Sequence, residues 1–188
     1  MKPYTLRSSR GKWEQETEYE VKFGKRRWRY EMANEAAVVM GCLSFTYTFS
    51  PEDEYVYFAY CVPYSYSFML NRVRQLQNDN PHFVHVDYSH SSAGGLTLPI
   101  ISITNPSQAQ KPHCLVIGRL HPGETQGSWT LDGFLRLLCS PKGYQLRQQL
   151  NFKIMPMVNA DGVVLGNFRT GILGRDLNRV FDLPERYN

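Results

Sequence analysis

The sequence has few cysteines and no closely spaced pair of them. The four cysteines lie far apart, and no CxxC motif is present, so the spacing predicts no disulfide. They are Cys42, Cys61, Cys114 and Cys139, and three of the four lie inside apolar runs, where a thiol behaves as a small hydrophobic side chain. We therefore expect free, buried cysteines in a reducing, intracellular compartment.

Long apolar runs and a strong charge of one sign are also missing. The first residues, MKPYTLRSSRGK, contain no apolar stretch typical of a signal peptide, and no later run is long enough to span a bilayer. The formal net charge is only +4, concentrated in KRRWR at residues 25–29, which favours a solvated basic strand over a nucleic-acid-binding patch. We expect no membrane segment and no nucleic-acid partner.

Residues that favour β-strands are abundant in the first half. The chain has 12 tyrosines, 10 phenylalanines and 3 tryptophans, and aromatic and β-branched side chains suit half-buried strands. Alternating apolar and polar residues predict strands over residues 19–30, 36–49 and 54–62, and two further extended segments over residues 83–90 and 96–104. One helix is predicted between these groups. Ser65 or Ser67 would cap it, and its apolar positions recur at helical spacing at Met69, Val73 and Leu76.

The pattern changes after residue 107. A short apolar strand, CLVIGRL, is followed by a helical pattern over residues 129–138 and by a second strand, FKIMPMV. This order predicts a βαβ unit with a parallel sheet and helices packed on it. The predicted fold is α/β plus all-β: an antiparallel β-sandwich-like module over residues 1–107, then the first part of an α/β domain over residues 108–188.

Two side chains with metal-binding chemistry follow the first apolar strand. His121 and Glu124 belong to the motif HPGE, at the end of a strand where α/β sheets collect ligands. Zinc binds imidazole nitrogen and carboxylate oxygen, and a catalytic zinc has three protein ligands and a water. An alternative is an ordinary helix start, where Glu124 only complements the helix dipole.

A glycine-rich stretch, NADGVVLGNFRTGILGRDLNR, follows the second strand and is predicted to be irregular. It contains Arg169, Asn178 and Arg179. An arginine and an asparagine together can bind a carboxylate, and a separate arginine can polarise a carbonyl oxygen. Taken singly, each arginine also fits a solvated loop.

These motifs carry a family resemblance. HPGE, the NADGVVLGNFR stretch and DLNR, in this order and spacing, resemble the zinc metallocarboxypeptidases. The segments CVPYSYSFMLNRVRQL and TLPIISITNPS resemble the N-terminal module of the cytosolic carboxypeptidase branch. The resemblance covers roughly residues 25–181. It implies a zinc-dependent enzyme that removes C-terminal residues, glutamates above all, from protein tails such as those of tubulin, in the cytoplasm and at microtubules or cilia.

The resemblance also implies roles for single residues. His121 and Glu124 would be the first two zinc ligands. Arg169 would help to polarise the scissile carbonyl, and Asn178 with Arg179 would bind the terminal carboxylate of the substrate. A third ligand, a histidine, and a general-base glutamate lie further along in the family.

The chain supplies no candidate for that third ligand. No histidine follows His121, and the other four are His82, His85, His90 and His113. His82, His85 and His90 could be read as a separate metal site, but surface histidines are the favoured interpretation. We therefore expect the isolated chain to be inactive.

Two positions depart from the family pattern. Ala160 stands where a proline is usual, and Arg175 stands where a small or acidic residue is common. Arg175 would add positive charge near the substrate cleft and favour acidic tails. The alternative function is a catalytically inactive protein that binds acidic tails through the basic and amide side chains of residues 169–179.

Overall fold

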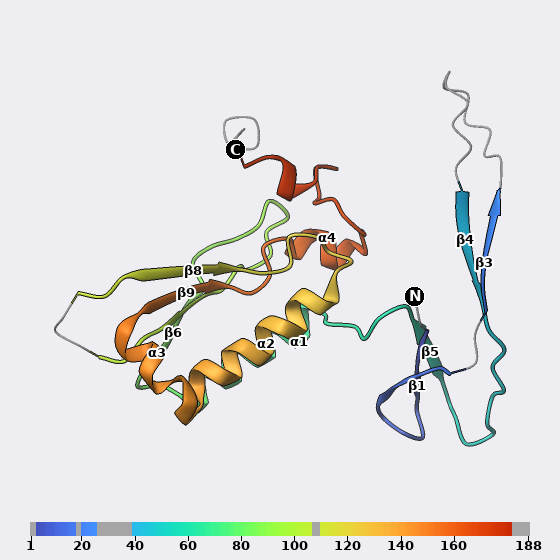
Figure 1. Ribbon diagram of the computed structural model, residues 1–188, viewed down its shortest axis with the longest axis horizontal. Helices are drawn as coiled ribbons and strands as arrows, with labels where there is room; N and C mark the ends of the chain where they lie inside the picture. Colours follow the sequence, from blue (N-terminus) through green and yellow to red (C-terminus); the bar gives the residue numbers. More distant parts are fainter. Residues whose placement is uncertain (1–2, 18–19, 26–38, 107–109, 182–188) are drawn as a thin grey trace. The chain divides into compact units, whose positions relative to one another are not determined.

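A computed structural model describes residues 3–17, 20–25, 39–106 and 110–181, and they form two compact units (Figure 1). The first unit spans residues 1–63 and the second spans residues 64–188. No helix among the described residues is long and apolar enough to cross a membrane.

The first unit consists of antiparallel strands. One sheet has the order β2-β1-β5, and a second contains β3 and β4. Their bounds are β1 Tyr4–Arg7, β2 Trp13–Gln15, β3 Glu20–Lys25, β4 Val39–Ser44 and β5 Val56–Ala59. The three strands predicted before residue 63 are confirmed as β3, β4 and β5 in their described parts, whereas the short strands β1 and β2 were not predicted. Residues 26–29 of the basic run lie outside the described residues.

The second unit is a mixed α/β layer structure. Its sheet has the order β6-β7-β9-β8, in which β8 and β9 are parallel and the other pairs antiparallel. In chain order its elements are α1 Tyr66–Asp79, β6 Val84–Asp87, β7 Ile100–Ile103, β8 His113–Ile117, α2 Thr125–Cys139, η1 Pro141–Gly143, α3 Tyr144–Gln149, β9 Asn151–Met155, α4 Ala160–Leu165 and η2 Leu177–Arg179. The predicted βαβ unit is confirmed as β8, α2 and β9, and an antiparallel module followed by an α/β part agrees with the predicted fold class.

The division between the units differs from the predicted boundary at residue 107. The structure divides the chain after Pro63, because α1, β6 and β7 belong to the second unit. Ile101 and Ile103 of β7 pair with Ile154 and Phe152 of β9, so the segment read as the end of a β-module is the middle of the α/β sheet.

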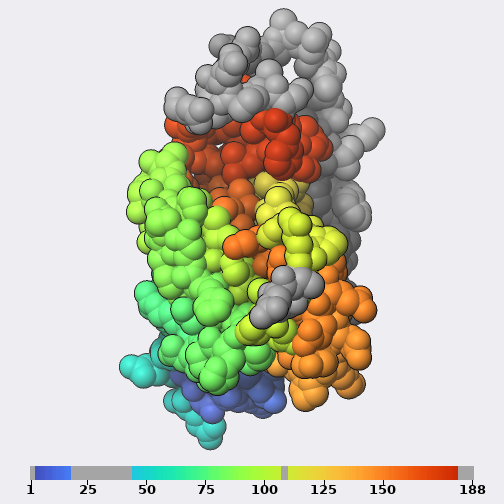
Figure 2. All heavy atoms as spheres, turned by 90° about the vertical axis from the view of Figure 1, so that its left-hand side faces the viewer, coloured from blue at the N-terminus to red at the C-terminus, as the bar shows by residue number. Residues whose placement is uncertain are grey.

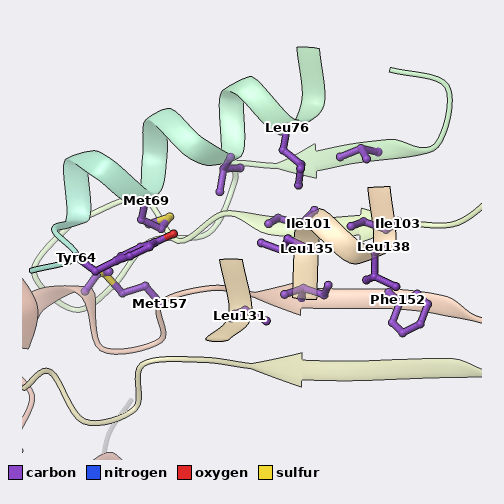
Figure 3. Packing of buried hydrophobic residues seen from close by; sticks show 14 residues of the cluster. Tyr64, Met69, Leu76, Ile101, Ile103, Leu131, Leu135, Leu138, Phe152 and Met157 are labelled. Carbon is purple, nitrogen blue, oxygen red and sulfur yellow. The ribbon is translucent and has the colours of Figure 1, made fainter. Parts of the chain in front are cut away.

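Helix α1 forms where the sequence predicts it. Ser65 is the N-cap, and its side chain accepts a hydrogen bond from the Phe68 N–H at 3.1 Å. The apolar face that includes Met69 is buried with side chains of α2 and with one face of the sheet, in a single core (Figure 3). The members of this core that Figure 3 labels are Tyr64, Met69, Leu76, Ile101, Ile103, Leu131, Leu135, Leu138, Phe152 and Met157. This core fixes the strand ends from which the candidate site is built.

The opposite face of the sheet carries polar side chains on β7 and β9 and exposed apolar side chains on β8. Lys153 donates a hydrogen bond to Ser102 across it at 2.7 Å, and both side chains point away from the core. Leu115 and Ile117 of β8 are 73% and 41% exposed. Among the described residues, the helices therefore cover one face of this sheet.

Candidate metal centre

The loop of residues 118–124 carries His121 and Glu124 from the end of β8 to the start of α2. The main chain of Asn159 fixes this loop, since its N–H donates to the Arg119 carbonyl at 3.2 Å. The Asn159 side chain donates to the Leu120 carbonyl at 3.0 Å, and Asn159 is only 2% exposed. Asn159 thus joins the start of the NADG stretch to the two residues directly before HPGE.

Glycines allow the motifs to approach so closely. A Cβ atom on Gly123 would lie 2.9 Å from the Phe168 carbonyl oxygen, to which the Gly123 N–H donates at 2.8 Å. A Cβ atom on Gly162 would lie 2.4 Å from Cγ of Pro122. Larger side chains at either position would separate the loop of His121 from the stretch that leads to Arg169.

His121 and Glu124 converge on one point. Nδ1 of His121 and Oε1 of Glu124 are 3.1 Å apart, and the two side chains are 11% and 44% exposed. Two ligands about 2.1 Å from a tetrahedral zinc lie about 3.4 Å apart, close to the distance found here. The two residues therefore fit as two ligands of a zinc ion. Among the described residues, no group of three histidine, cysteine or acidic side chains is arranged to hold a metal, and the surface histidines form no such cluster.

Asp176 lies behind His121, and the sequence reasoning gave it no role. Its Oδ1 is 3.0 Å from Nε2 of His121. With Nε2 protonated and donating to this carboxylate, the Nδ1 lone pair is directed to the metal side, next to Glu124. A ligating histidine ordinarily needs such a partner, but the sequence does not indicate which acidic residue supplies it.

Several donors keep Asp176 ionised. Arg169 donates from Nε to Oδ2 at 2.8 Å, and the Asn178 N–H donates to Oδ1 at 2.9 Å. Partial burial raises the pKa of Asp176, but the Asn178 N–H, His121 and Arg169 outweigh this effect and hold the pKa below its usual range. Figure 2 shows the red segment that contains Asp176 next to the yellow segment near residue 120.

The other predicted residues differ in how close they lie to His121 and Glu124. Asn178 lines a cavity of about 640 Å³ together with His121 and Glu124. Arg179 lies beside it on η2 and donates from Nη1 to the Asn178 carbonyl at 3.1 Å. Arg169, predicted to polarise a carbonyl, forms an ion pair with Asp176 and is 45% exposed.

Arg175 is separate from this cavity. It lines a smaller cavity of about 230 Å³, whose lining includes Asp161 and Ser92 but neither His121 nor Glu124. Asp176 thus joins His121, Arg169 and the main chain of Asn178, whereas Glu124 contacts His121 directly. Arg175 lies at a neighbouring cavity.

The predicted irregular stretch also contains a helix, α4. Asn159 caps this helix by accepting from the Gly162 N–H at 3.1 Å, and Gly166 ends it with a φ of 74°.

Comparison with known proteins identifies the family of this chain. The zinc carboxypeptidase family matches residues 69–187. Cytosolic carboxypeptidase 2 of Xenopus tropicalis is 38% identical over 146 residues, which are 73% of this chain and 15% of that protein. Cytosolic carboxypeptidase 6 of Mus musculus is 38% identical over 143 residues, 73% of this chain and 26% of that protein. The chain thus spans about a quarter or less of the length of these relatives.

Solved structures show the same fold. The metallo-carboxypeptidase from Burkholderia cenocepacia superposes with a TM-score of 0.72 at 23% identity, covering 100% of this chain and 46% of that chain. The metallo-carboxypeptidase from Pseudomonas aeruginosa superposes with a TM-score of 0.66 at 21% identity, covering 97% of this chain and 43% of that chain. With the family match over most of the second unit and the convergence of His121 and Glu124, the chain belongs to the zinc carboxypeptidase family.

Proposed function

We propose that this chain contributes two ligands and the carboxylate-binding residues to the active site of a zinc carboxypeptidase that removes C-terminal glutamates from protein tails such as those of tubulin. The observation that carries the proposal is the 3.1 Å approach of His121 Nδ1 to Glu124 Oε1. Asp176 on the far side of the imidazole holds its orientation. The relatives that carry the name cytosolic carboxypeptidase support a cytoplasmic place of action. A substrate on tubulin tails would in addition bring the protein to microtubules or cilia.

Zinc bound by His121 and Glu124 would supply Lewis-acid activation of water and of the scissile carbonyl. The protein's own groups then have distinct tasks. Asn178, on the wall of the cavity that His121 and Glu124 share, and Arg179 beside it bind the terminal carboxylate of the substrate. Arg169, which is ion-paired with the same carboxylate that His121 contacts, supplies the positive charge that would stabilise negative charge developing on the carbonyl oxygen.

No histidine lies between residues 122 and 188, so these residues supply no third histidine ligand. By the family resemblance, a histidine ligand and a general-base glutamate would complete the active site. Three arginines within residues 169–179 favour an acidic tail as the substrate.

A chimera tests this function. In it, the present chain replaces the 146 matched residues of the Xenopus tropicalis relative, and a peptide that ends in several glutamates serves as the substrate. Release of glutamate, followed by mass spectrometry, is expected from the chimera and is expected to be lost in His121→Ala. Binding of the peptide with no release by a folded, zinc-loaded chimera would favour the alternative, a non-catalytic protein that binds acidic tails.

A further inference from the structure

Arg119 has a backbone conformation that residues with a side chain rarely adopt. Its φ is 54°, and it is the one non-glycine residue with a positive φ in the part of the chain that the structure describes. A Cβ atom crowds the backbone in this left-handed region, so surrounding contacts must hold it there. The residue lies two positions before His121, inside the loop of residues 118–124.

The side chain of Arg119 provides such contacts. The residue is 7% exposed, and its Nε donates to the Pro122 carbonyl at 2.9 Å. Its Nη1 donates to Oγ of Ser128 on α2 at 2.9 Å and to the Tyr64 carbonyl at 3.2 Å. A buried guanidinium needs acceptors of this kind, since an unsatisfied buried charge is costly. The three acceptors belong to the loop itself, to α2 and to the segment before α1.

These bonds act on the turn between the two metal ligands. Pro122 stands between His121 and Glu124, so the bond to its carbonyl fixes the turn that sets their separation. The Glu124 N–H closes the same turn by donating to the His121 carbonyl at 3.2 Å, whereas the Glu124 side chain is 44% exposed and makes no capping bond at the start of α2. The opposite side of the loop is held by Asn159.

We propose that Arg119 is a positioning residue for the metal centre: its buried guanidinium holds the turn that sets His121 and Glu124 at the separation zinc requires. The inference rests on the proposed function, since it presumes that these two residues bind the ion. A residue that only stabilised the fold would affect unfolding and leave the affinity of the folded chain for zinc unchanged.

The test distinguishes the effect of the strained backbone at Arg119 from the effect of its guanidinium group. Zinc is titrated into the full 188-residue chain while the imidazole nitrogen shifts of the five histidines are followed by NMR. Arg119→Gly removes the guanidinium and relieves the positive φ, whereas Arg119→Ala removes the guanidinium and keeps the strain. Both are expected to raise the Kd for zinc at His121 by about 10- to 100-fold, the usual effect of losing a group that orients a ligand.

Two more variants guard against a simple loss of folding. Ser128→Ala removes one acceptor and little volume, and we expect it to raise the Kd for zinc by a few fold with an unchanged fold. Arg72→Ala is the matched control. Arg72 joins α1 to α2 by donating to Asp132 at 3.0 Å, and Arg136 still pairs with this carboxylate when Arg72 is removed. The Kd of Arg72→Ala for zinc should therefore equal that of the wild type.

The outcomes are distinct. If Arg119→Gly melts near the wild-type temperature and binds zinc with a Kd within twofold of it, Arg119 is a structural residue only and the inference is wrong. The inference also fails if Arg72→Ala weakens zinc binding as much as Arg119→Gly does. If the wild-type chain shows no zinc-dependent shift that His121→Ala abolishes, the metal centre itself is wrong, and the role of Arg119 is overturned with it.

Discussion

At the scale of single residues, Asp176 connects the two motifs of the site. It accepts from His121, Arg169 and the Asn178 N–H, so one carboxylate orients a ligand and sets the positions of two substrate-binding candidates. The order of the motifs in the sequence allowed His121, Glu124 and Asn178 to be predicted. It gave no role to Asp176, because a partner 55 residues away from its histidine is visible only once the chain is folded.

Asp176→Asn tests this connection. The amide keeps the shape of the side chain but loses the charge that holds the Nε2-protonated form of His121. We expect the affinity of the chain for zinc to fall by about 10- to 100-fold, measured by titration with a chromophoric chelator as competitor. Asp87→Asn, on a carboxylate that accepts from Ser89 on the surface, is the matched control and should bind zinc like the wild type. Equal affinity of Asp176→Asn and the wild type would contradict the role of Asp176.

Arg179 and Arg169 should differ in which kinetic constant they change. The substrate carboxylate is ionised in both the ground state and the transition state, whereas the carbonyl oxygen gains charge only as water attacks. In the chimera, Arg179→Ala should therefore raise KM by roughly 10- to 100-fold, the equivalent of about 1.5 to 3 kcal/mol, and Arg169→Ala should lower kcat by about 100-fold. A peptide with an amidated C-terminus is the control, because it lacks the charge that Arg179 binds. Equal cleavage of the amidated and free peptides would exclude this role for Asn178 and Arg179.

At the scale of elements, regular patterns were predicted well and short or irregular elements were not. Met69, Val73 and Leu76 recur at helical spacing in α1, and the strands on either side of α2 are short apolar runs. Such patterns depend only on neighbouring residues, so they can be recognised in the sequence. Helix α4 was missed because its six residues are too few for a periodic pattern, and its cap, Asn159, lies in a stretch rich in glycine. The two compact units divide after Pro63 and not at the predicted residue 107, because β7 is hydrogen-bonded to β9, about 50 positions further along the chain.

The N-cap of α1 gives a test at this scale. The sequence left Ser65 and Ser67 as alternatives, and the structure assigns the cap to Ser65. Ser65→Ala should lower the free energy of unfolding by about 1 kcal/mol, because the Phe68 N–H loses its acceptor. Ser67→Ala is the control: Ser67 is exposed within the helix, where alanine has the higher helix propensity, so stability should stay equal or rise. Urea denaturation of both variants measures the free energy of unfolding. A larger loss of stability for Ser67→Ala than for Ser65→Ala would contradict the assignment of the cap to Ser65.

At the scale of the whole molecule, the two units have separate roles in this account. Every buried apolar residue of the core cluster lies between Tyr64 and Ala160, and both proposed metal ligands, His121 and Glu124, belong to the same unit. A chain of residues 64–188 should therefore fold and bind zinc with the affinity of the full chain, as seen by circular dichroism and metal titration. Loss of zinc binding in a folded second unit would show that residues 1–63 take part in the site.

The most direct test of the central claim is to identify the atoms that bind zinc in the 188-residue chain. NMR of the imidazole nitrogens, with zinc added stepwise, should show a shift of Nδ1 of His121 and of no other histidine, and His121→Ala should abolish it. Because two protein ligands leave half of a tetrahedral shell to water, the ion should be lost on dialysis against a mild chelator. A shift at His82, His85, His90 or His113 instead, or zinc retained in a one-to-one ratio after dialysis, would contradict a centre built from His121 and Glu124.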